Sequence, residues 1–280
     1  MTYKIIGDSC TDLTWELKRD SHFQTVPLTL QVGERQIIDD ETFDQAEFLK
    51  LVREYEGCPK TACPSPEMYK EAFQCDADNI FVITLSEHLS GSYNSAMVAK
   101  QLYEEENGEN TKNIAVFSSD SASPGQLNIA LFIQELCEQD VPFEDIVRKT
   151  LRYRDNMRTY FVLESLDTLR KNGRLTGLQA FFATALNIKP IMGADHGVIV
   201  KLDQARGIHK ALTRMCEIIK KEVTEPEKKR LIIAHCNNSQ RAELVRNLLM
   251  KQGSFREILI TETRGVSTLY ANDGGIIVAV

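Results

Sequence analysis

Short apolar segments alternate with amphipathic segments along the first half of the chain. Asn79–Leu85 is an apolar run of strand length, and Glu41–Tyr55 carries apolar residues at helical spacing. Such alternation is typical of βαβ units, in which a helix connects two parallel strands. Strands are also expected at Tyr3–Gly7, Phe23–Val32, Arg35–Ile38 and Asn113–Ser118, and helices at Thr11–Arg19, Ser92–Glu106, Gly125–Gln139 and Phe143–Tyr153.

The pattern changes in the second half. Tyr160–Leu163 predicts a strand, and two helical stretches follow it, Leu166–Lys171 and Leu178–Leu186. Pro190–Gly193 and Gly197–Leu202 flank a short polar turn, so together they predict a β-hairpin. Further strands are expected at Arg230–His235, Glu257–Thr261 and Gly275–Val280, and further helices at Ile208–Glu222 and Ala242–Lys251.

These patterns predict an α/β protein with two domains. Residues 1–157 are expected to form a three-layer α/β/α domain with a mostly parallel sheet. Residues 158–280 are expected to form a two-layer α/β domain with a mixed sheet. No Pro- or Ser-rich linker separates the two halves, so we expect them to pack closely. With 280 residues and 42% hydrophobic content, the chain has enough apolar material for both cores.

Composition and charge exclude some functional classes and indicate the cellular compartment. A net charge of −7 argues against a general nucleic-acid binder, because such proteins gather a basic surface. No apolar run is long enough to span a bilayer, and Met1–Lys4 leads straight into a strand without signal-peptide organisation. The seven cysteines are odd in number and lack C-x-x-C spacing, which favours free thiols. A cytoplasmic protein without a transmembrane segment is expected.

Four hydroxyl-rich loops lie where predicted strands end and helices begin: Gly7–Leu13, Thr61–Pro66, Leu85–Ala96 and Ser118–Gly125. Helix capping explains each loop taken alone, because Ser, Thr and Asp side chains accept hydrogen bonds from free N–H groups at a helix start. Open α/β sheets bind ligands at the carboxyl ends of their strands, so four such loops together predict one shared crevice. The turn at residues 90–92 would offer helix-start N–H groups to a carboxylate or phosphate.

In order and spacing, these motifs resemble the DegV family of bacterial fatty-acid-binding proteins. The resemblance covers essentially the whole chain, and while any one motif is weak, the ordered series is strong. The motifs that carry it are Asp8-Ser9 with Asp12-Leu13, Thr61 with Pro64-Ser65-Pro66, Leu89–Ala96, Asp120-Ser121 with Ser123 and Gly125, Leu166–Leu175, and Leu186–Ile191.

The resemblance implies a carrier and not an enzyme. Members of the family hold a long-chain fatty acid between two α/β domains, without a further cofactor or metal. They present its carboxylate to a separate fatty acid kinase component, which forms an acyl phosphate for phospholipid synthesis. By position, Thr61 and the Ser90-Gly91 turn are expected to contact the carboxylate, with Ser92 beside them. Candidates for an apolar tunnel around the acyl chain are Phe161, Leu163, Leu166, Leu178, Phe181, Phe182 and Leu186.

One segment departs from the family pattern. The family usually ends with a His-x-Gly-Pro-Gly segment whose histidine helps to bind the carboxylate. The matching stretch here is 265–275, and we expect Ala271 where the histidine would fall, with Asn272 or Tyr270 as alternative donors. A smaller departure is Asn172 in place of a family glycine, which is tolerable because Asn adopts left-handed backbone conformations more readily than most residues.

Two other functions stay open from the sequence. Gly7-Asp8-Ser9 after the first strand is typical of a GDS-type serine hydrolase, but the chain has no Asp-x-x-His and no G-x-S-x-G motif. Neither G-x-G-x-x-G nor a Walker A motif is present, and no His/Glu cluster has metal-site spacing. A DegV-like scaffold that keeps the lipid as a structural cofactor is the second alternative.

Overall fold

The computed structural model describes residues 1–108, 111–175, 187–251 and 253–280. Its first sheet has the strand order β2-β1-β6-β7, and all neighbouring strands run parallel. This confirms the parallel sheet predicted for the first half. Every residue of β6 is buried, as expected for a central strand covered on both faces. The bounds are β1 Tyr3–Asp8, β2 Phe23–Val26, β6 Asn79–Thr84 and β7 Asn113–Ser118.

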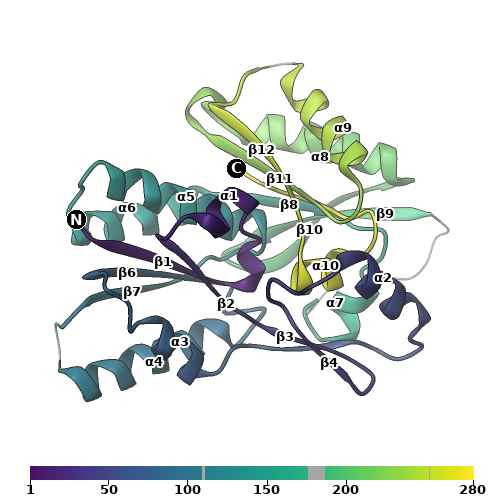
Figure 1. Cartoon of the computed structure of the whole chain (residues 1–280). Coiled ribbons are helices and arrows are strands. Elements are labelled where there is room, and N and C mark those ends of the chain that lie inside the picture. The colour runs from purple at the N-terminus through teal and green to yellow at the C-terminus, as the bar shows by residue number, and fades with distance from the viewer. Residues whose placement is uncertain (109–110, 176–186, 252) are drawn as a thin grey trace.

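Helices cover both faces of this sheet, which forms the predicted α/β/α sandwich (Figure 1). Successive residues of β6 point to opposite faces. Ile80 and Val82 therefore pack against α3 and α4, whereas Phe81 and Ile83 pack against α5 and α6. Ser65 caps α3 by accepting the N–H of Met68, and Pro66 occupies its first turn. The bounds are α3 Pro66–Ala72, α4 Ser92–Asn107, α5 Pro124–Glu138 and α6 Phe143–Asn156.

The second sheet has the order β10-β9-β8-β13-β11-β12. Only β11 and β12 pair in parallel, and the other neighbours are antiparallel, so the predicted mixed sheet is confirmed. The hairpin turns at His196 and Gly197, both with positive φ, which suits a tight β-turn. The bounds are β8 Thr159–Val162, β9 Ile188–Asp195, β10 Val198–Arg206, β11 Arg230–His235, β12 Glu257–Glu262 and β13 Ile276–Ala279.

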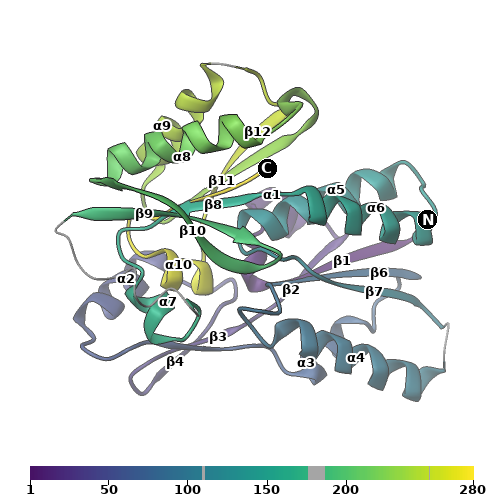
Figure 2. The ribbon, with the colours of Figure 1, turned by 180° about the vertical axis from the view of Figure 1, so that it is seen from behind.

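Helix α5 lies between the two sheets. Helices α8 (Ile208–Glu222) and α9 (Ser239–Met250) cover one face of the second sheet, and α5 contacts β11 and β13 on the other. The same helix contacts β1 and β6 of the first sheet, and most of its residues are buried. Figure 2 shows α5 and α6 running above β6 and β7, at the side of the second sheet. The two halves therefore share one layer of apolar packing.

A third, antiparallel sheet with the order β4-β3-β5 completes the fold. The predicted extended segments around Gly33 form its hairpin, β3 and β4. Thr61 was expected in a loop, but it lies in strand β5, paired with Leu30. Among the described residues, no helix is long and apolar enough to cross a membrane. The bounds are β3 Thr29–Val32, β4 Arg35–Ile38, β5 Lys60–Ala62, α2 Gln45–Glu54, α7 Asp167–Lys171 and α10 Gly265–Ala271.

The predicted helix Thr11–Arg19 forms as two pieces. Ser9–Thr11 makes a 3-10 turn (η1), and Asp12 then adopts a left-handed conformation with φ of 50°. Thr14 caps the short helix α1, Trp15–Arg19. A second 3-10 turn, η3, spans Pro226–Lys228. The break at Asp12 turns its carboxyl toward the interior, where it joins the site described next.

Candidate functional site

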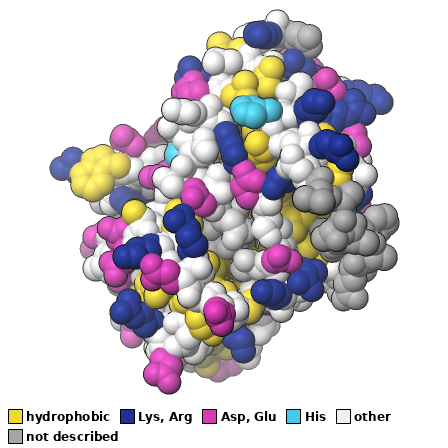
Figure 3. All heavy atoms as spheres, turned by 90° about the vertical axis from the view of Figure 1, so that its right-hand side faces the viewer, with side chains coloured by type: hydrophobic (Ala, Val, Ile, Leu, Met, Phe, Trp, Pro, Cys, Tyr) yellow, Lys and Arg dark blue, Asp and Glu magenta, His cyan; other side chains and the backbone are white. Residues whose placement is uncertain are grey.

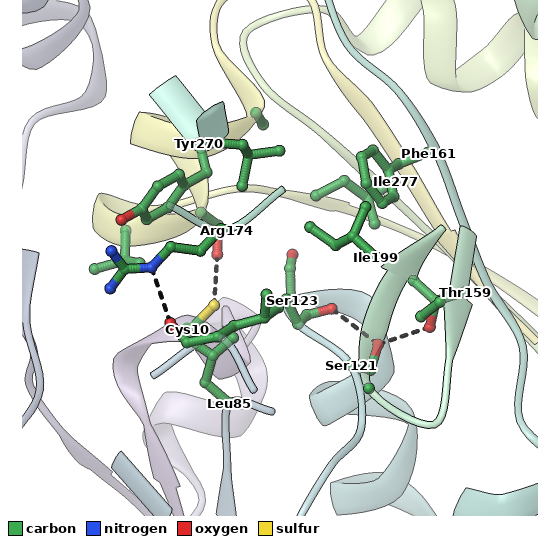
Figure 4. Close-up of a pocket in the computed structure, with 18 of the residues that line it drawn as sticks. Cys10, Leu85, Ser121, Ser123, Thr159, Phe161, Arg174, Ile199, Tyr270 and Ile277 are labelled. Atoms are coloured by element: carbon green, nitrogen blue, oxygen red, sulfur yellow. Dashed lines mark hydrogen bonds between the residues drawn. The ribbon is translucent and has the colours of Figure 1, made fainter. Parts of the chain in front are cut away.

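An apolar pocket lies where the carboxyl ends of the first sheet meet the second sheet (Figure 4). Its empty space is about 740 Å³ when the open solvent at its mouth is included. Both halves of the chain supply its wall. Its wall includes Cys10, Leu89, Asp120, Ser121, Ser123, Thr159, Phe161, Leu163, Arg174, Ile199, Ser267, Tyr270 and Ala271.

Most polar side chains in the wall bond to each other or to the protein behind them. The Ser121 and Thr159 hydroxyls lie 2.7 Å apart and form a hydrogen bond. The Ser123 hydroxyl donates to Asp12 Oδ2 at 2.5 Å. With these partners satisfied, the wall offers mainly carbon atoms to a ligand, which suits an alkyl chain.

The two ends of the pocket differ in charge. In Figure 4, Tyr270 and Arg174 lie at one end, and Ser121 and Thr159 lie at the other. The Arg174 side chain donates through Nε to the carbonyl of Leu89 at 3.1 Å, which holds its positive charge at the first end. Asp120, next to Ser121 in the chain, is a wall residue whose carboxylate pairs with Arg154 at 3.3 Å. An anionic head group is therefore favoured at the Arg174 end.

The four predicted head-group residues lie next to this end, outside the wall. The Thr61 hydroxyl is 3.1 Å from the Tyr270 hydroxyl, within hydrogen-bond distance. Ser90 follows the wall residue Leu89, and its hydroxyl accepts the N–H of Ser92 at 3.2 Å. Gly91 is the N-cap of α4 and is an exposed residue, so an anion can reach this helix start.

Ser92 differs from the other three because its hydroxyl is already satisfied within the protein. The residue is fully buried, and its Oγ donates to Asp8 Oδ2 at 2.6 Å. It also lies 2.6 Å from the Tyr69 hydroxyl. These two bonds fix the start of α4, and with it the position of the Ser90-Gly91 turn.

The predicted tunnel residues divide into two groups. Phe161 and Leu163 line the pocket, and Leu166 packs into the same apolar cluster. The other four, Leu178, Phe181, Phe182 and Leu186, lie outside the described residues.

Asp8 is the buried link between the loops after β1, β6 and β7. Its Oδ2 accepts the Leu85 N–H at 2.7 Å in addition to Ser92, and its Oδ1 accepts Gln126 Nε2 at 2.8 Å. Burial raises the pKa of this carboxyl, and the hydrogen bonds from Ser92, Gln126 and the backbone oppose that rise. The predicted convergence of these three loops is therefore confirmed. The polar side chains that meet there bond to each other within the protein.

Asp12 forms a second buried junction beside the pocket. Besides Ser123, it accepts the Arg264 N–H at 2.9 Å. Burial raises its pKa from 3.8 to about 8, against the effect of hydrogen bonds from Ser123 and Ser267. Neutral Asp12 next to a lipid-like pocket avoids the cost of a buried charge.

The raised pKa of Asp12 predicts a pH dependence of stability. Asp12 keeps its proton in the folded protein up to about pH 8, whereas the unfolded chain releases it at about pH 4. The contribution of Asp12 to the free energy of unfolding is therefore full below about pH 4 and is lost as the pH rises through about 8. The free energy of unfolding should fall between about pH 4 and 8, and Asp12→Asn should show a shallower fall. Urea denaturation of both proteins at several pH values measures this, and parallel curves would refute it.

The geometry around Ser9 does not favour the hydrolase alternative. The Ser9 hydroxyl accepts the Leu28 N–H at 3.0 Å and donates to the buried Asp39 carboxyl. None of the five histidines, all within the described residues, forms a hydrogen bond with Ser9. Across the described residues, no group of three His, Cys, Asp or Glu side chains is arranged to hold a metal ion.

Comparison with known proteins identifies the family. The family model described as "Uncharacterised protein, DegV family" matches residues 2–280. The chain belongs to the DegV family. A curated DegV domain-containing protein of Streptococcus gordonii is 35% identical over 284 residues, which cover 99% of this chain and 98% of that protein.

Several solved DegV structures share the fold. One from Ruminococcus gnavus, refined with vaccenic acid, is 49% identical with a TM-score of 0.97, and each chain is covered fully. One from Eubacterium eligens, loaded with heptadecanoic acid, is 30% identical with a TM-score of 0.90, at 99% and 98% coverage. The Streptococcus pneumoniae Fatty Acid Kinase (Fak) B3 protein, loaded with linoleic acid, is 31% identical with a TM-score of 0.90, at 100% and 99% coverage.

The structure also places the segment that departs from the DegV pattern. Ala271, expected where the family histidine falls, is buried and lines the pocket with its methyl group. Its neighbour Tyr270 is the residue that reaches Thr61. From the sequence, Tyr270 is only one of two alternative donors, because no periodicity indicates which side chain of a short helix faces a strand more than 200 residues away.

Proposed function

We propose that this DegV protein binds a long-chain fatty acid in the apolar pocket and presents its carboxylate to a partner kinase. The observation that carries the proposal is a pocket with a carbon-rich wall and with Arg174 and the Thr61–Tyr270 hydroxyl pair at one end. Burying an alkyl chain there would contribute about 0.8 kcal/mol per methylene group. The fatty acids found in the Ruminococcus, Eubacterium and Streptococcus proteins support the same ligand class.

The charges at the two ends give the ligand its direction. Arg174 favours the carboxylate at one end, whereas the Asp120 carboxylate at the other end is already paired with Arg154. Thr61, Ser90 and the N–H group of Gly91 are then the proposed contacts, and Ser92 beside them holds the turn in place. Hydroxyl and backbone donors at a helix start bind an anion without a metal ion.

The proposal also includes a kinase step. A separate component would phosphorylate the presented carboxylate, as the likeness to the Fatty Acid Kinase (Fak) B3 protein suggests. On the face shown in Figure 3, acidic and basic side chains are interspersed. Such a mixture suits pairing with a complementary protein surface better than it suits nucleic acid, which attracts a field of one sign. A cytoplasmic location and the function as a carrier without its own catalysis are parts of this proposal.

Mass spectrometry of the protein, purified natively and then denatured, tests the proposal directly. A long-chain fatty acid should be released in near-stoichiometric amount. A protein that is lipid-free in repeated preparations, and that also fails to take up added oleate, would refute fatty-acid binding and favour another function.

Thr61→Val and Ser90→Ala should each weaken oleate binding about tenfold to a hundredfold. Each removes a hydrogen bond to a charged group, worth about 1.5–3 kcal/mol. Ser90→Ala should also cost about 1 kcal/mol of stability, because Ser90 accepts the Ser92 N–H. Titration calorimetry and urea denaturation separate the two effects.

Thr224→Val and Ser254→Ala are matched controls, since both residues are exposed. They should leave affinity and stability unchanged. Lost stability with unchanged oleate affinity in the Thr61 and Ser90 variants would show that these residues serve only the fold.

A further inference from the structure

The Tyr270 ring is held by packing, and its hydroxyl can form a hydrogen bond in addition to the one with Thr61. The ring packs against two apolar clusters, one around Leu163 and Met192 and the other around Leu30 and Phe48. Its hydroxyl bonds only to Thr61 Oγ1, at 3.1 Å, among the described residues. Packing therefore sets the position of the hydroxyl, while its hydrogen-bond partner can change.

The Thr61–Tyr270 pair has a free donor whichever hydroxyl donates. Each hydroxyl carries one hydrogen and two acceptor lone pairs. One hydrogen is used between the two residues, so the other remains available. Two hydroxyls 3.1 Å apart can also donate both hydrogens to one bound carboxylate, which then replaces the bond between them.

The surroundings indicate the same ligand group. Tyr270 is a wall residue at the Arg174 end of the pocket (Figure 4), and its hydroxyl reaches Thr61 of β5. A phenol is also more acidic than an aliphatic hydroxyl, with a usual pKa near 10, and so is the better donor to an anion. An uncharged alkyl chain would gain nothing from either hydroxyl.

We propose that the Tyr270 hydroxyl is a direct donor to the fatty-acid carboxylate, and that ligand binding exchanges the Thr61–Tyr270 hydrogen bond for two bonds to the carboxylate. This inference rests on the proposed fatty-acid binding, and of the two alternative donors named from the sequence it selects Tyr270 over Asn272. The methyl group of Ala271 then serves only the apolar wall.

A comparison of charged and uncharged ligands tests the inference. Tyr270→Phe keeps the ring and removes only the hydroxyl. Its affinity for oleate should fall about tenfold to a hundredfold, whereas its affinity for oleyl alcohol should fall by no more than about threefold. Tyr55→Phe is the matched control, because Tyr55 is exposed and its hydroxyl has no hydrogen-bond partner among the described residues. It should change neither affinity.

The outcomes separate this inference from the proposed function. Equal losses for oleate and oleyl alcohol would show that Tyr270 has only a packing role. An unchanged oleate affinity in Tyr270→Phe, with a loss in Thr61→Val, would also overturn the inference but leave fatty-acid binding in place. If the unaltered protein binds neither ligand and purifies without lipid, the proposed function fails first.

Discussion

Replacing Asp8 with alanine is expected to lower the free energy of unfolding by about 3–5 kcal/mol. The change removes the shared acceptor of three buried donors: the Leu85 N–H, the Ser92 hydroxyl and the Gln126 amide. Ser92 and Gln126 keep weaker alternatives in the Tyr69 and Thr11 hydroxyls, whereas the Leu85 N–H loses its side-chain acceptor. Each unsatisfied buried donor costs about 1–3 kcal/mol. Urea denaturation at neutral pH measures the loss.

Asp76→Ala is the control for this experiment, since Asp76 is exposed. Its stability should stay within about 0.5 kcal/mol of the unaltered protein. The stability of Asp8→Asn should lie between those of Asp8→Ala and Asp76→Ala. Asparagine keeps one acceptor oxygen, but its amide adds a donor that faces the existing donors. A loss below about 1 kcal/mol in Asp8→Ala would contradict the view that Asp8 holds the three loops together.

Ile199→Trp is expected to weaken fatty-acid binding by about a hundredfold or more while the protein stays folded. Ile199 points into the pocket from β10 (Figure 4), so the larger ring fills space that the acyl chain would occupy. Displacing about four methylene groups costs about 3 kcal/mol of binding, which corresponds to roughly a hundredfold. Oleate titration and thermal unfolding measure the two properties.

Val198→Trp provides a matched control on the same strand. Neighbouring residues of a strand point to opposite faces, and Val198 is 41% exposed whereas Ile199 is 7% exposed. The control should bind oleate normally. If both variants bind equally well, the acyl chain does not occupy this pocket.

Sequence pattern predicted those elements whose formation depends on local signals. The apolar strands β6 and β7 and the hairpin of β9 and β10 follow from apolar runs and a turn. Strand β5 was missed because its three residues are polar or exposed and form a strand only by pairing with β3, about 30 residues earlier. Such pairing leaves no local signal in the sequence.

The candidate site was predicted in outline but not in its contacts. Spacing indicated that the loops after β1, β6 and β7 meet, and the bonds from Asp8 to Ser92 and from Asp12 to Ser123 confirm it. The hydroxyl of Ser92 could equally have faced a ligand, and only the structure shows it bonded to Asp8. The placement of Tyr270 depends on how α10 packs, which no short motif specifies.

The position of α5 between the two sheets has a consequence for how the protein can be divided. A fragment beginning at residue 158 would lack the helix that covers one face of β11 and β13, and it would expose apolar side chains such as Ile232. Neither half is then expected to fold well in isolation, despite the change of sheet type between them. Heating should accordingly melt the whole chain in one cooperative transition, and the halves should have been inherited together and not shuffled as separate modules.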